Sequence, residues 1–256
     1  EQFAKARIVE LPTKLGKKRR LAVLTVPQYY ENVAADTALI LKRLGKEDIE
    51  GVALDLRRNG GGILPEAVEL TGLFFPEGPV VQVQNYVKQK QVLKDEDPST
   101  VYDGPLVVMV SNLSASAAEI TAAALQDYGR ALIVGDKTTH GKGTVQTLVE
   151  LNKIRNTPKE SGLLKYTISK FYRVEGSTTQ RNGVTPDIIL PSIYDYMELG
   201  EAHLPQSLEP DSIDPADYEI MHRVRDTVNT LKKTSAERIK TVTDFQYIMD
   251  DIKRYQ

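Results

Sequence analysis

Residues 105–135 read PLVVMVSNLSASAAEITAAALQDYGRALIVG, and the fold class can be inferred from these residues. LVVMVS (106–111) is a continuous apolar run typical of a buried strand, and ALIVG (131–135) is a second such run. The residues between them, 114–129, are rich in alanine and have a helical period. The order of strand, helix and strand predicts an α/β fold, in which helices pack against a sheet of buried strands.

The same alternation precedes this stretch. RLAVLTV (20–26) and GVALDL (51–56) are predicted strands, and the helical pattern at 32–44 between them completes a β-α-β unit. A further helix is predicted in PEAVELTGLFF (65–75), whose proline suits a first helical turn. VVQVQNYV (80–87) alternates in the manner of a strand.

The pattern changes from residue 144 onward. TVQTLVEL (144–151) and LLKYTISKFYRV (163–174) are longer predicted strands, with turns expected at 156–161. DIILP (187–191) is a short strand bounded by proline. We therefore expect antiparallel β structure to close the domain.

The composition shifts again beyond about residue 200. Three prolines lie in an acidic stretch, and a polar helical pattern follows at 217–255. We therefore predict a boundary near residue 200, between a core at 1–199 and a C-terminal helical extension at 200–256.

The composition excludes several classes of site. The 256 residues carry 33 Lys and Arg against 35 Asp and Glu, a net charge of −2, with 41% hydrophobic residues. The chain has no Cys and three His, so disulfides, thiolate metal sites and a Cys nucleophile are excluded, and a metal would need carboxylate ligands. The balanced charge argues against a general nucleic-acid binder, and the basic run at 17–20 is expected to be a solvated edge. No apolar run approaches the roughly 20 residues that span a bilayer.

Ser116 is the first candidate for chemistry. It lies where the predicted strand at 106–111 turns into the alanine-rich helix, and such corners present a hydroxyl nucleophile beside main-chain N–H groups. The same residues also fit the capping box S-x-x-E, in which Ser116 caps the helix and Glu119 caps back. Both readings of Ser116 stay open from this segment alone.

Lys142, in HGKGTVQ (140–146), is the candidate base for such a nucleophile. An ordinary lysine has a pKa of roughly 10.4, so a base that works near neutrality needs burial to lower its pKa by about three units. In an extended segment Thr144 and Gln146 project from the same face as Lys142, and either would hold the amine in place. The alternative is a loop lysine that bonds carbonyls or lies in solvent.

The run NGGG (59–62) supplies candidate donors for an oxyanion. The N–H of Gly61 or Gly62, together with that of Ala117, would form the oxyanion hole, although a tight turn or an anion-binding loop would use the same glycines. The run matches neither the P-loop pattern nor the dinucleotide-binding pattern.

A Ser-His-Asp triad would use His140 and Asp127. Asp127 lies eleven residues after Ser116, roughly 16 Å along a continuous helix, so direct contact between them requires a break in the helix. A hydrogen bond at the helix end is the simpler role for Asp127, and an exposed loop imidazole is the simpler role for His140.

These residues together resemble the S41 serine peptidases, and closely the tail-specific, or C-terminal processing, proteases of the bacterial cell envelope. The resemblance covers roughly residues 20–190 and runs in order through six segments: DLRRNGGG (55–62), PLVVMVSNLSASAAEI (105–120), AALQDYGRALIVG (123–135), GKGTVQ (141–146), KFYRV (170–174) and STTQRNGVTPDI (177–188), the last with one extra Thr.

The resemblance implies a crotonase-like (ClpP/crotonase) α/β peptidase core with an added antiparallel β portion. It implies a Ser-Lys dyad in which Ser116 is the nucleophile, Lys142 the base and Gln146 the residue that orients the lysine. Asp127 matches an aspartate that is sometimes grouped with the dyad, and we expect it to play a supporting part. The reaction this implies is acyl transfer, which requires no metal or cofactor.

The implied function is a serine endopeptidase (hydrolase) for proteolysis of unfolded or C-terminally tagged envelope proteins in the bacterial periplasm. The implied partners are unfolded polypeptides or protein C-termini, not nucleic acid. An adaptor or membrane-associated partner and the oligomeric state stay open.

Two features depart from the family pattern. Residues 1–20 contain no recognisable PDZ domain, so we expect a catalytic core that recognises protein tails poorly. Lys142 lies 26 residues after Ser116, one more than the family pattern, and the extra residue falls in the loop at 136–141. The alternative functions are a latent protease that needs its PDZ domain, or a non-catalytic module of this fold that binds a peptide or another ligand.

Overall fold

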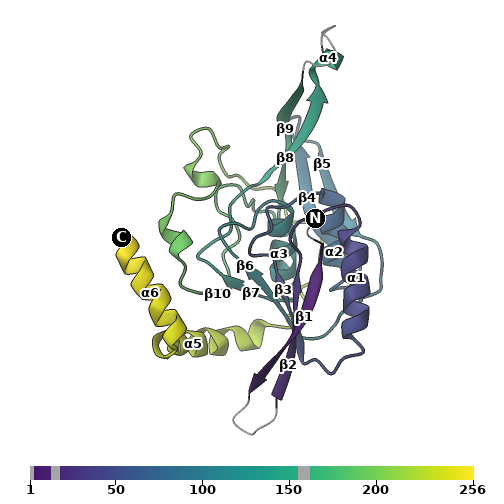
Figure 1. The fold of residues 1–256 in the computed structure, drawn as a ribbon. Coiled ribbons are helices and arrows are strands. Elements are labelled where there is room, and N and C mark those ends of the chain that lie inside the picture. The colour runs from purple at the N-terminus through teal and green to yellow at the C-terminus, as the bar shows by residue number, and fades with distance from the viewer. Residues whose placement is uncertain (1–2, 13–17, 155–161) are drawn as a thin grey trace.

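The computed structural model describes residues 3–12, 18–154 and 162–256 and contains two sheets. The six-stranded sheet has the order β1 (Lys5–Pro12), β2 (Lys18–Thr25), β3 (Gly51–Asp55), β6 (Leu106–Val110), β7 (Leu132–Gly135), β10 (Ile188–Ile189). The four-stranded sheet has the order β5 (Lys90–Asp95), β4 (Gly78–Asn85), β9 (Leu163–Tyr172), β8 (Thr144–Glu150). The β8–β9 pair continues past the body of the protein at one end, with the four-residue helix α4 (Leu151–Ile154) at its tip (Figure 1).

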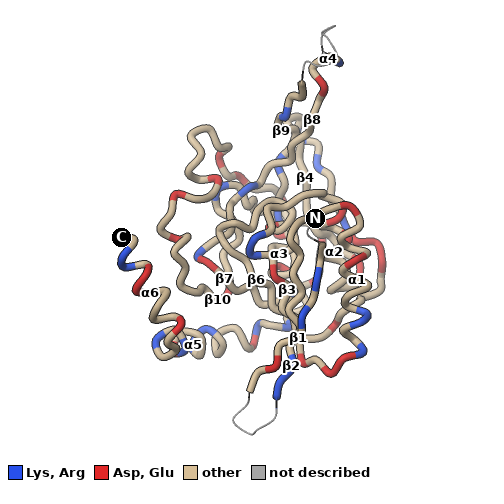
Figure 2. The backbone as a smooth tube through the Cα atoms, in the orientation of Figure 1, with Lys and Arg blue, Asp and Glu red and all other residues tan. Residues whose placement is uncertain are grey.

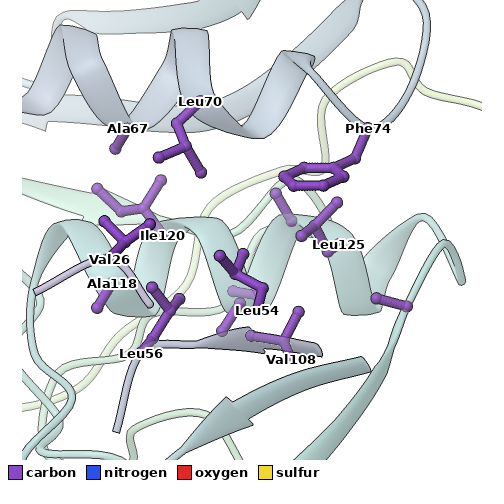
Figure 3. Close-up of a cluster of buried hydrophobic side chains, with 14 of the residues drawn as sticks. Val26, Leu54, Leu56, Ala67, Leu70, Phe74, Val108, Ala118, Ile120 and Leu125 are labelled. Carbon is purple, nitrogen blue, oxygen red and sulfur yellow. The ribbon is translucent and has the colours of Figure 1, made fainter. Parts of the chain in front are cut away.

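Strands β2, β3, β6 and β7 are parallel, as the alternation of strands and helices predicts. Helix α3 (Ala117–Asp127) lies between this sheet and helix α2 (Leu64–Gly72), which packs in turn against α1 (Val33–Leu44). Figure 3 shows Leu54 and Val108 of the sheet below Leu125 of α3, with Leu70 and Phe74 on the far side. Five of the buried residues of α3 are alanines, and their small side chains allow the helix to be enclosed on several sides.

The predicted elements of the core are confirmed, with one correction and two omissions. The strand at 187–191, expected to join the antiparallel structure, instead pairs parallel with β7 through Ile188 and Ile189. Asp187 accepts a hydrogen bond from the N–H of Ile133 at 2.8 Å, which holds the returning chain beside β7. Strands β1 and β5 were not predicted because most of their residues are exposed and lack a buried face. The turns expected at 156–161 lie outside the described residues.

The C-terminal part is less helical than its polar pattern suggests. Before its helices the chain lies along the core, where the N–H of Met221 donates to the carbonyl of Tyr128 at 2.8 Å. The helical region is two helices, α5 (Arg225–Thr241) and α6 (Thr243–Tyr255), because Val242 between them is extended. Helix α5 buries no side chain, whereas α6 buries Ile252 and contacts the short helix η1 (Ile193–Tyr196). Figure 1 shows α5 and α6 at the C-terminal end of the chain.

Charges of both signs are spread over the described chain (Figure 2). In the basic run at 17–20, Lys18, Arg19 and Arg20 form ion pairs with Glu10, Glu50 and Glu47, all at least partly exposed, while Lys17 lies outside the described residues. No described helix combines the length and the apolar character needed to cross a bilayer.

Arg130 connects the end of α3 to the segments that follow α2 and β5. Its side chain is almost fully buried, with 1% of its surface exposed. Its guanidinium donates to the carbonyls of Phe74 at 2.6 Å, Tyr102 at 2.9 Å and Gly104 at 2.9 Å. Burial lowers the pKa of Arg130 to about 10, so the group stays charged at neutral pH.

We expect Arg130→Met to lower the free energy of unfolding by about 3 kcal/mol or more, because three carbonyls lose their donor and each such loss costs about 1–3 kcal/mol. Equilibrium denaturation in urea measures this effect. Arg43→Met, at an exposed position of α1, is the matched control and should change stability by less than about 0.5 kcal/mol. Equal unfolding midpoints for the two variants would contradict the assignment.

Candidate active site

Ser116 lies at the corner between β6 and α3, as the sequence predicts. Its backbone has φ 56° and ψ −114°, a positive-φ conformation outside the left-handed helical region that is strained for a residue with a Cβ atom. Its N–H donates to Glu119 Oε2 at 2.7 Å, so Glu119 fulfils its part of the predicted capping box. Ser116 is therefore fixed by its backbone in an uncommon conformation at the start of α3.

A cleft of about 450 Å³ brings most of the predicted site residues together. Its lining includes Ser116, Ala117, Gly62, Lys142 and Gln146, which come from three separate parts of the chain. Two larger clefts, of about 600 and 560 Å³, contain none of the predicted site residues in their linings. The extra residue in the loop at 136–141 therefore leaves Lys142 in the same cleft as Ser116.

Lys142 is partly buried, and its amine donates to the main-chain carbonyl of Thr144 at 2.6 Å. Burial lowers the pKa of this amine; the carboxylates of Glu201 and Glu119 oppose that shift, and the charge of Lys165 adds to it. Thr144 holds the amine, but through its main-chain carbonyl and not through the side chain on which the prediction rested. This contact is of the kind expected for the alternative, a loop lysine that bonds carbonyls.

Gln146 is an exposed residue of β8 whose side chain lines the cleft. The strict alternation expected for residues 142–146 is interrupted, because the pairing of β8 with β9 shifts register between Val145 and Gln146. Val145 therefore lines the cleft together with Thr144 and Gln146.

The glycine loop packs directly against Ser116. A Cβ atom on Gly61, where φ is +101°, would lie 2.8 Å from Ser116 Cβ and 3.1 Å from the nitrogen of Ala117. The N–H of Gly61 donates to Asn59 Oδ1 at 2.9 Å, so it is already engaged. Of the two glycines considered for an oxyanion hole, Gly62 is the one that lines the cleft beside Ala117.

Glu119 has a larger role than the sequence suggests. Its carboxylate is fully buried and accepts four hydrogen bonds. One comes from the N–H of Ser116, and the others come from Thr139 Oγ1 at 2.5 Å, Gly141 N–H at 2.7 Å and Lys142 N–H at 3.0 Å. Burial raises the pKa of Glu119 to about 7, and these donors limit the rise because they favour the ionised form. One carboxylate thus ties the main chain of Ser116 to that of Lys142.

Asp127 and His140 lie outside the lining of the cleft that contains Ser116. The carboxylate of Asp127 forms a buried ion pair with Arg173 at the far end of α3. His140 is half-buried, its Nε2 lies 3.8 Å from Glu201 Oε2, and burial lowers its pKa. The structure therefore assembles no Ser-His-Asp triad from these residues. Across the described ranges no three His, Asp or Glu side chains gather as metal ligands.

Known proteins are similar in sequence to most of this chain. It is 40% identical over 257 residues to a tail-specific protease of Haemophilus influenzae, covering 97% of this chain and 37% of that protein. It is 34% identical over 196 residues to a carboxy-terminal-processing protease of Bartonella bacilliformis, covering 72% of this chain and 43% of that protein. The chain thus spans less than half the length of these relatives.

Two solved structures support the fold. The photosystem II D1 C-terminal processing protease superposes with a TM-score of 0.61 at 26% identity, covering 72% of this chain and 48% of that one. Mature CPAF in complex with lactacystin superposes with a TM-score of 0.60 at 16% identity, covering 92% of this chain and 55% of that one. The predicted peptidase fold, with an antiparallel sheet and C-terminal helices, is confirmed.

Two family models account for nearly the whole chain. The model described as the C-terminal domain of tail specific protease (DUF3340) matches residues 194–256, which include α5, α6 and all but the first residue of η1. The model described as peptidase family S41 matches residues 20–190, which include both sheets except β1, and the cleft with Ser116 and Lys142. The chain therefore belongs to peptidase family S41.

Proposed function

We propose that this chain is the catalytic part of a serine endopeptidase in which Ser116 is the nucleophile and Lys142 is the general base. The observation that carries this proposal is the shared cleft, in which a backbone-strained serine and a lysine with a lowered pKa both form part of the lining. The amine of Lys142 bonds a neutral carbonyl, a contact that favours its charged form less than a carboxylate contact would.

In the proposed reaction the neutral amine of Lys142 accepts the hydroxyl proton of Ser116 while the oxygen attacks a peptide carbonyl. The N–H groups of Gly62 and Ala117 stabilise the oxyanion of the tetrahedral intermediate, and the start of α3 adds the favourable end of its dipole. Lys142 then returns the proton to the leaving amine. In deacylation Lys142 takes a proton from water, whose oxygen attacks the acyl carbonyl; the bond from that carbon to Ser116 Oγ breaks, and Lys142 returns the proton to Ser116. Gln146 holds the lysine in position.

The proposed substrates are unfolded or C-terminally tagged polypeptides of the bacterial periplasm or cell envelope. The names of the Haemophilus and Bartonella relatives, a tail-specific protease and a carboxy-terminal-processing protease, support this assignment. The glycine loop and β8 both contribute to the lining of the cleft, so in this proposal an extended chain reaches Ser116 between them. Asp127 acts at a distance in this scheme, because its ion pair with Arg173 fixes the far end of α3.

We expect Ser116→Ala and Lys142→Ala each to reduce cleavage of an unstructured protein by at least about a thousandfold, because either change removes a group that forms or breaks a bond. Electrophoresis of timed digests measures this loss. Lys137→Ala, at an exposed position of the preceding loop, is the matched control and should cleave at the parent rate. Cleavage that survives Lys142→Ala would rule out the lysine as base, and no cleavage by the parent chain would favour the latent or binding alternatives.

We also expect kcat/KM to increase with pH as Lys142 loses its proton. Because burial lowers the pKa of this amine, the midpoint of the rise should lie below roughly 10.4, the value of an ordinary lysine. Initial rates between pH 6 and 11, roughly spanning the His and Lys ranges, measure the profile, and circular dichroism checks that the fold persists. His140→Ala should leave the midpoint within about half a unit of the parent; a midpoint abolished by that change would point to an imidazole base instead.

A further inference from the structure

The loop that carries Lys142 is held from two sides. On its inner side, Glu119 of α3 accepts the N–H groups of Gly141 and Lys142. On its outer side lies the start of the short helix η2 (Glu201–His203), within the segment that matches the C-terminal domain of tail specific protease. No role for this C-terminal segment follows from the sequence, yet the segment contacts the loop that carries Lys142.

The outer contact begins with the main chain. The N–H of Glu201 donates to the carbonyl of His140 at 2.8 Å, two residues before Lys142. Gly200 makes this approach feasible, because a Cβ atom there would lie 2.7 Å from the same carbonyl oxygen and φ is +97°. The C-terminal segment thus contacts the loop at position 200, where only glycine can be accommodated without strain.

The side chain of Glu201 continues the contact through a buried amide. Gln180, which is fully buried, donates from Nε2 to Glu201 Oε1 at 3.1 Å. The Oε1 atom of the same amide accepts the N–H of Gly143 at 2.8 Å. An amide rotated by 180° would present its NH₂ group to the N–H of Gly143, so the carboxylate of Glu201 selects the orientation that holds the residue after Lys142.

We propose that Glu201 is a positioning residue for the catalytic base: through Gln180 and the carbonyl of His140, the C-terminal segment fixes the loop that places Lys142 in the cleft. This inference rests on the proposed role of Lys142 as the base. It gives the C-terminal segment a part in the construction of the active site.

The charge of Glu201 adds an electrostatic consequence. Its carboxylate stabilises the ammonium form of Lys142 and so opposes the effect of burial on the pKa of that amine. The other charged groups that face Lys142 are Glu119 on α3, which acts in the same direction, and Lys165 on β9, which acts in the opposite one. His140 lies on the same loop; burial lowers its pKa, the charge of Glu201 opposes that shift, and the charge of Lys142 adds to it.

The two effects of Glu201 are separable by substitution. Glu201→Gln keeps an acceptor for Gln180 and removes the charge, so kcat on the alkaline plateau should stay within about twofold of the parent. The midpoint of its kcat/KM profile should move to lower pH by about half a unit, because neutral Lys142 becomes easier to form. Glu201→Ala removes the acceptor as well, and its plateau kcat should fall about tenfold with KM changed less than about twofold.

Glu198→Gln is the control, because it removes the same charge at an exposed position three residues earlier. It should reproduce the parent in kcat and in pH profile. If Glu201→Ala and Glu201→Gln both behave like Glu198→Gln, the proposal is overturned.

Amide hydrogen exchange of Gly143, measured by NMR on the same chains, tests the loop without any cleavage assay. Exchange should be at least about tenfold faster in Glu201→Ala than in the parent, and near the parent rate in Glu201→Gln and Glu198→Gln. Unchanged exchange in Glu201→Ala would overturn the proposal. If the parent shows no Ser116-dependent cleavage, the proposed function fails, and the exchange rate alone then decides whether Glu201 fixes the loop.

Discussion

The carboxylate of Glu119 is the interaction on which the site depends. A fully buried carboxylate is unfavourable unless donors surround it, and here the donors are the main chain of Ser116 and of the loop that carries Lys142. The two segments therefore cannot move apart without leaving this buried carboxyl group and its N–H donors without hydrogen-bond partners. The alanine-rich composition of α3 serves the same end, because small side chains allow the helix, and Glu119 with it, to be enclosed between the sheet and α2.

The parts of the fold that local pattern determines were predictable. Each element at 105–135 is recognisable from neighbouring residues alone: an apolar run marks each strand, and a helical period marks the helix. Ser116 could therefore be placed at the corner between the first strand and the helix. The parallel pairing of β10 could not be predicted, because a strand of two isoleucines is too short to show a periodic pattern. Its partner residues in β7 also lie more than fifty residues earlier in the chain. The helical pattern at 217–255 likewise gave no sign that Met221 and its neighbours would lie along the core.

The candidate site was likewise predictable where it depends on local motifs, and not where it depends on contacts between distant segments. Motif spacing placed Ser116 and Lys142, but hydrogen bonds between distant segments decide what their neighbours do. Asn59 engages the N–H of Gly61, and this leaves Gly62, which lines the cleft, as the glycine of the proposed oxyanion hole. Asp127, which the family resemblance groups with the dyad, contacts Arg173 instead, so any influence on the site is transmitted along α3.

The order of contacts along the chain has a consequence for biosynthesis. The loop that carries Lys142 is held from outside by residues that are translated later: Thr179 bonds the carbonyl of Lys142, and Gln180 bonds the N–H of Gly143. A nascent chain therefore contains Ser116, Glu119 and Lys142 before it contains the residues that hold the loop from outside. The geometry of the loop that carries Lys142 is therefore complete only when the segment with Thr179 and Gln180 has folded against it.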